Sequence, residues 1–130
     1  MNHQALNILV ADDEALMRGL LTSFLTNECN HKVIKSQDGK EALREFKLHA
    51  NDIDIVFLDI EMPKMDGLET LEKIRAINPD AYVVILGGAG YMENVKKAIA
   101  AGVNGFIVKP YNNNKILEAI ENYKRARDGQ

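Results

Sequence analysis

Five short apolar runs are spaced along the chain, and each is followed by a stretch with apolar residues at helical spacing. The runs are rich in β-branched residues and too short for helices, so they predict strands. They comprise residues 8–11, 33–34, 53–58, 82–86 and 106–108. The helical stretches carry, in order, Leu16, Leu20, Leu21, Phe24 and Leu25; Ala42, Leu43 and Phe46; Leu68, Leu71 and Ile74; Val95, Ala98, Ile99 and Gly102; and Ile116, Leu117 and Ile120.

Strict alternation of strand and helix predicts an α/β fold, in which a mostly parallel sheet lies between two layers of helices. Each crossover between parallel strands needs a helix to return the chain. The third and fourth runs are apolar almost throughout, as expected of central strands covered on both faces. The 130 residues suit one compact domain, 1–130, and leave no room for a second full domain.

Charge and cysteine content narrow the functional classes. The formal net charge is −3 and the basic residues are scattered, which is not the electrostatic pattern of a nucleic-acid binder. The basic residues Lys124, Arg125 and Arg127 are expected in the last turn of a helix. The single cysteine, Cys29, excludes an internal disulfide and fits a reducing compartment. Without a secretory pattern or an apolar run that could span a bilayer, we expect a cytoplasmic protein.

Charged residues follow three of the predicted strands. Asp12, Asp13 and Glu14 come after the first, Asp59 comes directly after the third, and Lys109 follows the fifth. Ligands of open α/β sheets bind outside the carboxyl ends of the strands. We therefore expect the carboxylates that follow the first and third strands and the ammonium group of Lys109 to meet at one edge of the sheet.

Carboxylates gathered this closely repel one another, so either some stay protonated or a cation neutralises them. Oxygen ligands without histidine or thiolate favour a hard ion, and Mg²⁺ suits an open cleft with few protein ligands. Asp59 then has the position of a carboxylate nucleophile that forms an acyl phosphate. Each residue alone has a plainer interpretation: residues 12–14 as a helix cap, Asp59 as a turn residue and Lys109 as a surface lysine. Their joint placement at successive strand ends favours the functional interpretation.

The chain resembles the receiver domains of two-component response regulators over nearly its whole length. The resemblance is carried by Asp12-Asp13, by residues 56–63 (VFLDIEMP) with 65–67 (MDG), and by residues 106–110 (FIVKP). Residues 100–105 (AAGVNG) also look like the approach to the last strand of that family. The implied architecture is a doubly wound (βα)₅ flavodoxin-like sandwich with strand order 2-1-3-4-5.

The resemblance also implies a role for individual residues. Asp59 would be the phosphoacceptor, and Asp13, Asp59 and the backbone carbonyl of Glu61 would ligate Mg²⁺. Asp12 would act through a metal-bound water. Lys109 would pair with Asp59 before transfer and with a phosphoryl oxygen afterwards, and the Lys109-Pro110 bond would be cis.

The resemblance further implies the partners. The phosphoryl donor would be a phosphohistidine on a sensor histidine kinase or a histidine phosphotransfer protein, and the output would be binding to a downstream protein target, without direct contact to nucleic acid or membrane. The protein would be a signalling phosphoacceptor with self-catalysed phosphotransfer and autodephosphorylation rather than an enzyme. It could be a stand-alone regulator or part of a larger protein.

Three positions depart from the family pattern or call for comment. Gly87, followed by Gly88, stands where the family usually has Ser or Thr, so no hydroxyl is available to meet the phosphoryl group. Phe106 stands at the position of the switching aromatic residue and fits an ordinary sheet residue equally well. We expect phosphorylation chemistry to be retained while signal relay to the surface of the last two helices and last strand is weakened or rerouted. A carboxylate at Glu61 could orient water, repel the phosphoryl group or lie in solvent.

Three alternatives to a phosphorylated receiver make different demands on the sequence. A phosphohydrolase resembling haloacid dehalogenases would need an Asp-x-Asp motif after the first strand, which Asp12-Asp13-Glu14 does not provide. A flavodoxin-like cofactor binder would need a loop rich in Gly and Thr to hold a phosphate, whereas the first loop here is acidic. A scaffold that never turns over phosphate is compatible with Gly87.

Overall fold

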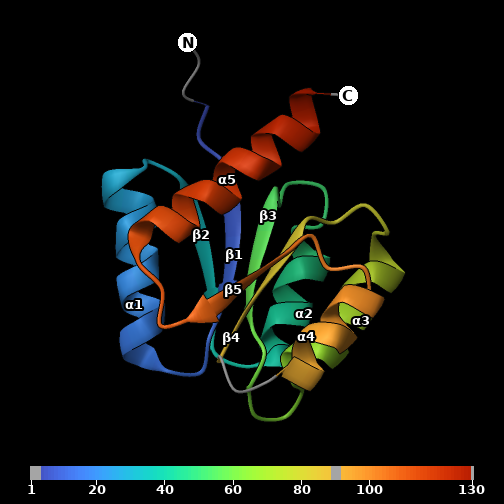
Figure 1. Cartoon of the computed structure of the whole chain (residues 1–130). Coiled ribbons are helices and arrows are strands. Elements are labelled where there is room, and N and C mark those ends of the chain that lie inside the picture. The colour runs from blue at the N-terminus through green and yellow to red at the C-terminus, as the bar shows by residue number, and fades with distance from the viewer. Residues whose placement is uncertain (1–3, 89–91, 130) are drawn as a thin grey trace.

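The structure is a computed structural model that describes residues 4–88 and 92–129. Across these residues, five parallel strands alternate with helices (Figure 1). The strands are β1 (Asn7–Ala11), β2 (Lys32–Ser36), β3 (Ile55–Asp59), β4 (Val83–Gly88) and β5 (Gly105–Lys109). The helices are α1 (Ala15–Ser23), which continues into the π-helical turn η1 (Phe24–Glu28), α2 (Gly39–Leu48), α3 (Gly67–Ile77), α4 (Met92–Ala100) and α5 (Asn113–Asp128).

The strands form one sheet in the order β2-β1-β3-β4-β5, and every pairing is parallel. The predicted (βα)₅ flavodoxin-like fold and its strand order 2-1-3-4-5 are therefore confirmed. The chain runs from β1 outward to β2, then crosses back to β3 on the other side of β1. The strand order thus reverses between β1 and β3, which is where open α/β sheets bind their ligands.

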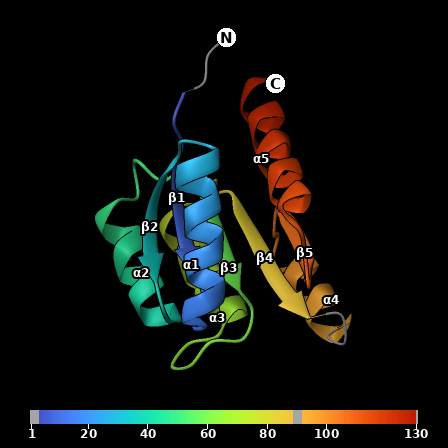
Figure 2. The ribbon, with the colours of Figure 1, turned by 90° about the vertical axis from the view of Figure 1, so that its left-hand side faces the viewer.

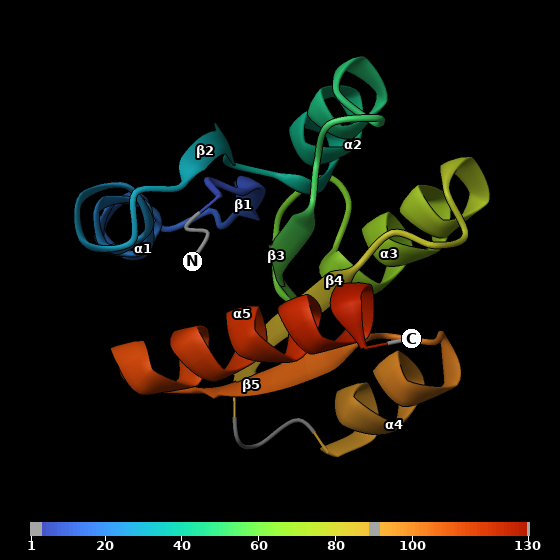
Figure 3. The same ribbon diagram turned by 90° about the horizontal axis from the view of Figure 1, so that it is seen from above.

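Helices cover both faces of the sheet, as Figure 3 shows from above. On one face, α1 and α5 pack against side chains of the central strands; on the other face, α2, α3 and α4 do so. The two layers bury separate sets of apolar residues, so the strands between them carry side chains that point alternately into each. The first set includes Leu21, Leu25, Ile116 and Ile120; the second includes Ala42, Phe46, Leu71, Ile74 and Ala98.

Every strand differs from the sequence prediction by one or two residues at one or both ends, and two of these differences involve Asp59 and the glycines of β4. The third strand begins at Ile55 instead of residue 53 and includes Asp59. Gly87 and Gly88, which the prediction placed after the fourth strand, lie within β4 and pair with Val108 and Lys109. The prediction stopped early because glycine has no side chain to register in an apolar pattern, whereas ladder pairing uses the backbone alone.

Fewer leucines of the first helix are buried than its apolar spacing predicts. Leu21 and Leu25 are buried, but Leu16 and Leu20 leave 73% and 58% of their surface exposed. The helix lies against the sheet along one stripe only, and these two leucines lie outside it. The end of this helix widens into the π-helical turn η1.

The carboxyl ends of the strands lie at the opposite end of the molecule from the last turn of α5, as the arrowheads of β2 and β4 show in Figure 2. Three of the described helices that begin near this edge have side-chain caps, and in α5 the cap is Asn112, whose Oδ1 accepts from the Lys115 N–H at 3.2 Å. Asp38 accepts a hydrogen bond from the backbone of Glu41 in α2 at 2.8 Å, and Asp66 accepts one from Glu69 in α3 at 2.9 Å. Among the described residues, no helix is both long and apolar enough to cross a membrane.

Candidate functional site

Three aspartates meet at the carboxyl edge of the sheet. Asp12 and Asp13 follow β1, and Asp59 is the last residue of β3, which pairs directly with β1. One carboxylate oxygen from each of the three lies within 4.8 Å of those of the other two. Asp12 and Asp59 are buried, at 1% and 4% exposure, whereas Asp13 is exposed. The structure thus brings these three carboxylates together, as the sequence predicted.

The β1–α1 turn shows why these acids are not simply a helix cap. The N-cap of α1 is Glu14, and its side chain makes no capping hydrogen bond. Asp12 accepts a hydrogen bond from the Glu14 N–H through Oδ1 at 2.9 Å, and its own N–H donates to the carbonyl of Ser36 at 3.1 Å. These bonds leave Oδ2 of Asp12 free to take part in the cluster.

Lys109 brings the positive charge to this cluster from the end of β5. Its Nζ donates to Oδ1 of Asp59 at 3.0 Å and lies 3.9 Å from Oδ2 of Asp12. The Lys109 side chain is 23% exposed, so its ammonium group is partly withdrawn from water. The following Lys109-Pro110 peptide bond is cis, as the resemblance implied.

Burial and charge shift the ionisation of the groups in this cluster. Burial raises the pKa of Asp59 to about 6, and the Asp12 charge adds to the rise, while the Lys109 hydrogen bond opposes it. Burial alone would lower the pKa of Lys109, but the hydrogen bond and charge of Asp59 outweigh it and raise that pKa. Burial, with the charges of Asp12 and Asp59, raises the pKa of Tyr111 to about 12. The hydrogen bond and charge of Lys109 therefore offset only part of the effect of burial on the pKa of Asp59.

The donor set fits a hard divalent cation. It consists of carboxylate oxygens without histidine or thiolate, and Mg²⁺ is bound in proteins by one or two carboxylates together with water. Burial is the main cause of the raised pKa of Asp59, the charge of Asp12 adds to it, and Lys109 offsets only part of the rise. The edge of the sheet thus offers the oxygen ligands that a hard divalent cation such as Mg²⁺ prefers.

The loop after Asp59 folds back tightly onto the end of β3. The N–H of Gly67 donates to the carbonyl of Ile60 at 2.9 Å, and a Cβ atom on Gly67 would lie 2.4 Å from the carbonyl oxygen of Asp59. Only glycine lets α3 begin this close to the acidic cluster. Glu61 lies within this loop with an exposed side chain, outside the three-carboxylate cluster.

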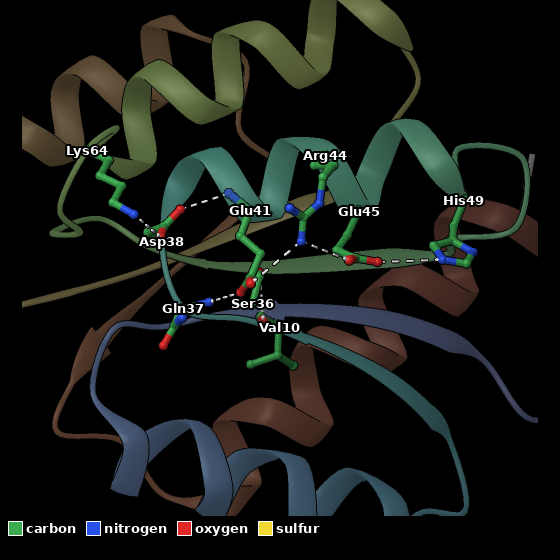
Figure 4. Close-up of polar contacts among 9 residues, drawn as sticks. All are labelled: Val10, Ser36, Gln37, Asp38, Glu41, Arg44, Glu45, His49 and Lys64. Atoms are coloured by element: carbon green, nitrogen blue, oxygen red, sulfur yellow. Dashed lines mark hydrogen bonds and ion pairs between the residues drawn. The ribbon is translucent and has the colours of Figure 1, made fainter.

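An ion pair that the sequence pattern did not predict joins the same loop to the start of α2. Lys64 has a positive φ of 69°, and the Met65 N–H donates to the carbonyl of Pro63 at 2.7 Å, which makes a tight γ-turn. Nζ of Lys64 lies 3.5 Å from Oδ2 of Asp38 (Figure 4). The backbone hydrogen bond from Glu41 lowers the pKa of Asp38, and the Lys64 charge lowers it further. No periodic pattern marks such a contact, because it joins two loops far apart in the sequence.

The positions expected to act as a switch lie beside one another in β4 and β5. Gly87 is buried, and a Cβ atom there would lie 2.8 Å from Cζ of Phe106 and 3.2 Å from Cγ2 of Ile60. Gly88 is partly exposed and pairs with Lys109. The ring of Phe106 therefore lies over the backbone of Gly87, in space that a larger side chain would need.

Comparison with known proteins agrees with the fold. The family described as response regulator receiver domain matches residues 8–121. The chemotaxis protein CheY of Treponema pallidum is 38% identical over 113 residues, covering 87% of this chain and 78% of that protein. CheY of Bacillus subtilis is 36% identical over 113 residues, covering 87% of this chain and 92% of that protein.

Solved structures show the same similarity. A CheX-CheY-BeF₃-Mg²⁺ complex from Borrelia burgdorferi contains a chain with a TM-score of 0.82 and 37% identity, with 88% of this chain and 86% of that chain covered. A response regulator receiver domain protein from Clostridium thermocellum has a TM-score of 0.89 and 31% identity, with 94% and 96% covered.

Proposed function

The chain belongs to the response regulator receiver domain family, and on that premise we propose that it accepts a phosphoryl group from a phosphohistidine onto Asp59. One observation supports this most strongly. Oδ1 of Asp59 lies 3.0 Å from Nζ of Lys109, and carboxylate oxygens of Asp12 and Asp13 lie within 4.8 Å of an oxygen of Asp59. A buried nucleophile, a partner cation and a set of hard oxygen ligands are thus together in one place.

Mg²⁺ is the proposed cofactor. In this proposal, Asp13, Asp59 and the backbone carbonyl of Glu61 hold the ion, and Asp12 acts through a water bound to it. The chemistry that a bound Mg²⁺ supplies is neutralisation of negative charge on the transferring group. The CheX-CheY-BeF₃-Mg²⁺ complex from Borrelia burgdorferi, with a chain 37% identical to this one, supports the same choice of ion here.

The transfer itself is a displacement at phosphorus. A carboxylate oxygen of Asp59 forms a bond to phosphorus while the bond to the imidazole nitrogen of the donor breaks and leaves its electron pair on that nitrogen. The product is an acyl phosphate on Asp59. The Lys109 ammonium group, which donates to Asp59 before transfer, then donates to a phosphoryl oxygen. Hydrolysis of the acyl phosphate at the same site would reset the protein.

The proposed donors are a sensor histidine kinase or a histidine phosphotransfer protein, in the cytoplasm. Because the receiver itself supplies the nucleophile and the stabilising charges, small donors such as acetyl phosphate should also serve. The proposed output is binding to a downstream protein target. The solved complex of CheX with a similar CheY chain supports a protein as the binding partner.

A second candidate function is a scaffold that binds partners without turning over phosphate. Gly87 favours it, because position 87 offers no hydroxyl to the phosphoryl group. The intact acidic cluster and its ion pair with Lys109 favour phosphotransfer, since a scaffold has no need of a buried carboxylate with a raised pKa.

Mass spectrometry of the intact protein distinguishes the two. Native protein incubated with Mg²⁺ and acetyl phosphate should gain the mass of one phosphoryl group, and the gain should disappear in Asp59→Asn protein or when EDTA replaces Mg²⁺. A native protein that never gains this mass would leave only the scaffold function.

A further inference from the structure

The peptide unit between Asp12 and Asp13 is held from helix α1. Arg18, in the first turn of α1, donates from Nη1 to the carbonyl oxygen of Asp12 at 2.7 Å. This carbonyl lies beyond the last residue pair of β1, so the sheet does not supply its hydrogen bond. The N–H of Asp12 donates to Ser36, and Oδ1 accepts from Glu14. Arg18 thus completes the set of bonds that fixes Asp12.

Asp13 depends on this backbone for its direction. Its side chain is exposed, and within residues 4–88 and 92–129 it makes no hydrogen bond or ion pair. A carboxylate oxygen of Asp13 nevertheless lies within 4.8 Å of oxygens of Asp12 and Asp59. An exposed side chain without partners is placed mainly by its backbone, and Arg18 fixes the peptide unit that precedes it.

The charge of Arg18 and its hydrogen bond should affect a bound cation in opposite directions. The guanidinium group is close to the acidic cluster, because it contacts the backbone of one of its members. As a charge alone, it would repel a divalent cation, and its removal would tighten binding. As a clamp on the backbone, it would hold Asp13 in place, and its removal would weaken binding. The sign of the change therefore separates the two effects.

We propose that Arg18 is a positioning residue for the cation site: by holding the carbonyl of Asp12, it keeps the carboxylate of Asp13 beside those of Asp12 and Asp59. This proposal rests on the proposed function, since it takes Mg²⁺ as the cation. Arg18 itself does not contact the ion or the phosphoryl group.

The test is the Mg²⁺ dissociation constant of the full chain, measured from amide resonances in ¹H–¹⁵N spectra without any phosphoryl donor. Arg18→Ala and Arg18→Gln should each weaken binding about tenfold, the lower end of the loss seen when a group supporting a metal ligand is removed. Glutamine is a good helix former but is too short to reach the carbonyl, so it serves if the alanine variant does not fold.

Arg44→Ala is the matched control. Arg44 is 65% exposed on α2, and among the described residues its contacts are ion pairs of 3.7 Å with Glu41 and Glu45 (Figure 4). Its loss removes the same charge without touching the cluster, so Mg²⁺ affinity should stay within about twofold of native. Tighter or unchanged Mg²⁺ binding in both Arg18 variants would contradict the positioning role of Arg18. An equal loss of Mg²⁺ affinity in Arg44→Ala protein would contradict it as well. Native protein that does not bind Mg²⁺ would instead contradict the proposed function.

Discussion

The ring of Phe106 lies against the backbone of Gly87, so closely that a Cβ atom on Gly87 would be 2.8 Å from Cζ and 3.3 Å from Cε1 of the ring. The two residues are on neighbouring strands, β4 and β5. A side chain at position 87 and the present position of the ring therefore exclude each other. Position 87 has no side chain that could carry a hydroxyl, and the Phe106 ring occupies the space that such a side chain would need.

A double-mutant cycle measures this exclusion. Gly87→Ala should lower the free energy of unfolding by about 1–3 kcal/mol, because the new methyl group displaces the Phe106 ring. In a Phe106→Ala background, the same change should cost little. Urea unfolding of the four proteins gives the coupling energy, which should be about 1 kcal/mol or more. Equal costs in both backgrounds would show that the ring does not occupy this space.

The conformational response of Phe106 to a phosphoryl mimic on Asp59 should be weaker in the native protein than in a Gly87→Thr variant. A threonine hydroxyl could donate to a phosphoryl oxygen, and a hydrogen bond to a charged oxygen contributes about 1.5–3 kcal/mol, comparable with typical allosteric coupling. Beryllofluoride bound at Asp59 should therefore shift the resonances of Phe106 and Tyr111 less in native protein than in the variant. Shifts as large in native protein as in Gly87→Thr protein would contradict the weakened relay.

The raised pKa of Asp59 predicts a pH-dependent cost to stability. The unfolded chain loses the Asp59 proton near its ordinary pKa of 3.8, whereas the folded protein keeps it until about pH 6. The contribution of Asp59 to stability is therefore full below pH 3.8 and is lost as the pH rises through about 6. Without metal, the free energy of unfolding of native protein should fall by about 2–3 kcal/mol relative to that of Asp59→Asn protein as the pH rises from about 4 to about 7.

Urea unfolding at the two pH values checks this, and Mg²⁺ provides the control. In the proposed function the ion binds the ionised carboxylate of Asp59, so saturating Mg²⁺ should reduce the stability advantage of Asp59→Asn protein at neutral pH. A stability difference between the two proteins that is the same at both pH values would mean that Asp59 ionises normally in the folded state.

The sequence predicted the sheet and the acidic edge for a simple physical reason. Runs of β-branched residues mark the strands, and residues that follow successive parallel strands must meet at one edge. Asp12, Asp13, Asp59 and Lys109 could therefore be placed together before the structure was known. The family resemblance added the strand order and the cis bond before Pro110, and both are found.

Other features depend on contacts that no local pattern encodes. The bond from Arg18 to Asp12 requires the exact rotation of α1 relative to β1, and the ion pair of Lys64 with Asp38 joins two loops. Leu16 has the spacing of a buried residue but lies exposed, because the position of the helix on the sheet decides which apolar stripe is covered. The packing of Phe106 on Gly87 is likewise a cross-strand relationship.

The central claim is that Asp59 carries the phosphoryl group, and chemical trapping of the acyl phosphate tests it most directly. Borohydride reduces an aspartyl phosphate to homoserine, which peptide mass spectrometry locates in the chain. After incubation with Mg²⁺ and acetyl phosphate, homoserine should be found at position 59 and at neither Asp12 nor Asp13. Homoserine at another position, or none in protein that has gained the phosphoryl mass, would contradict the account.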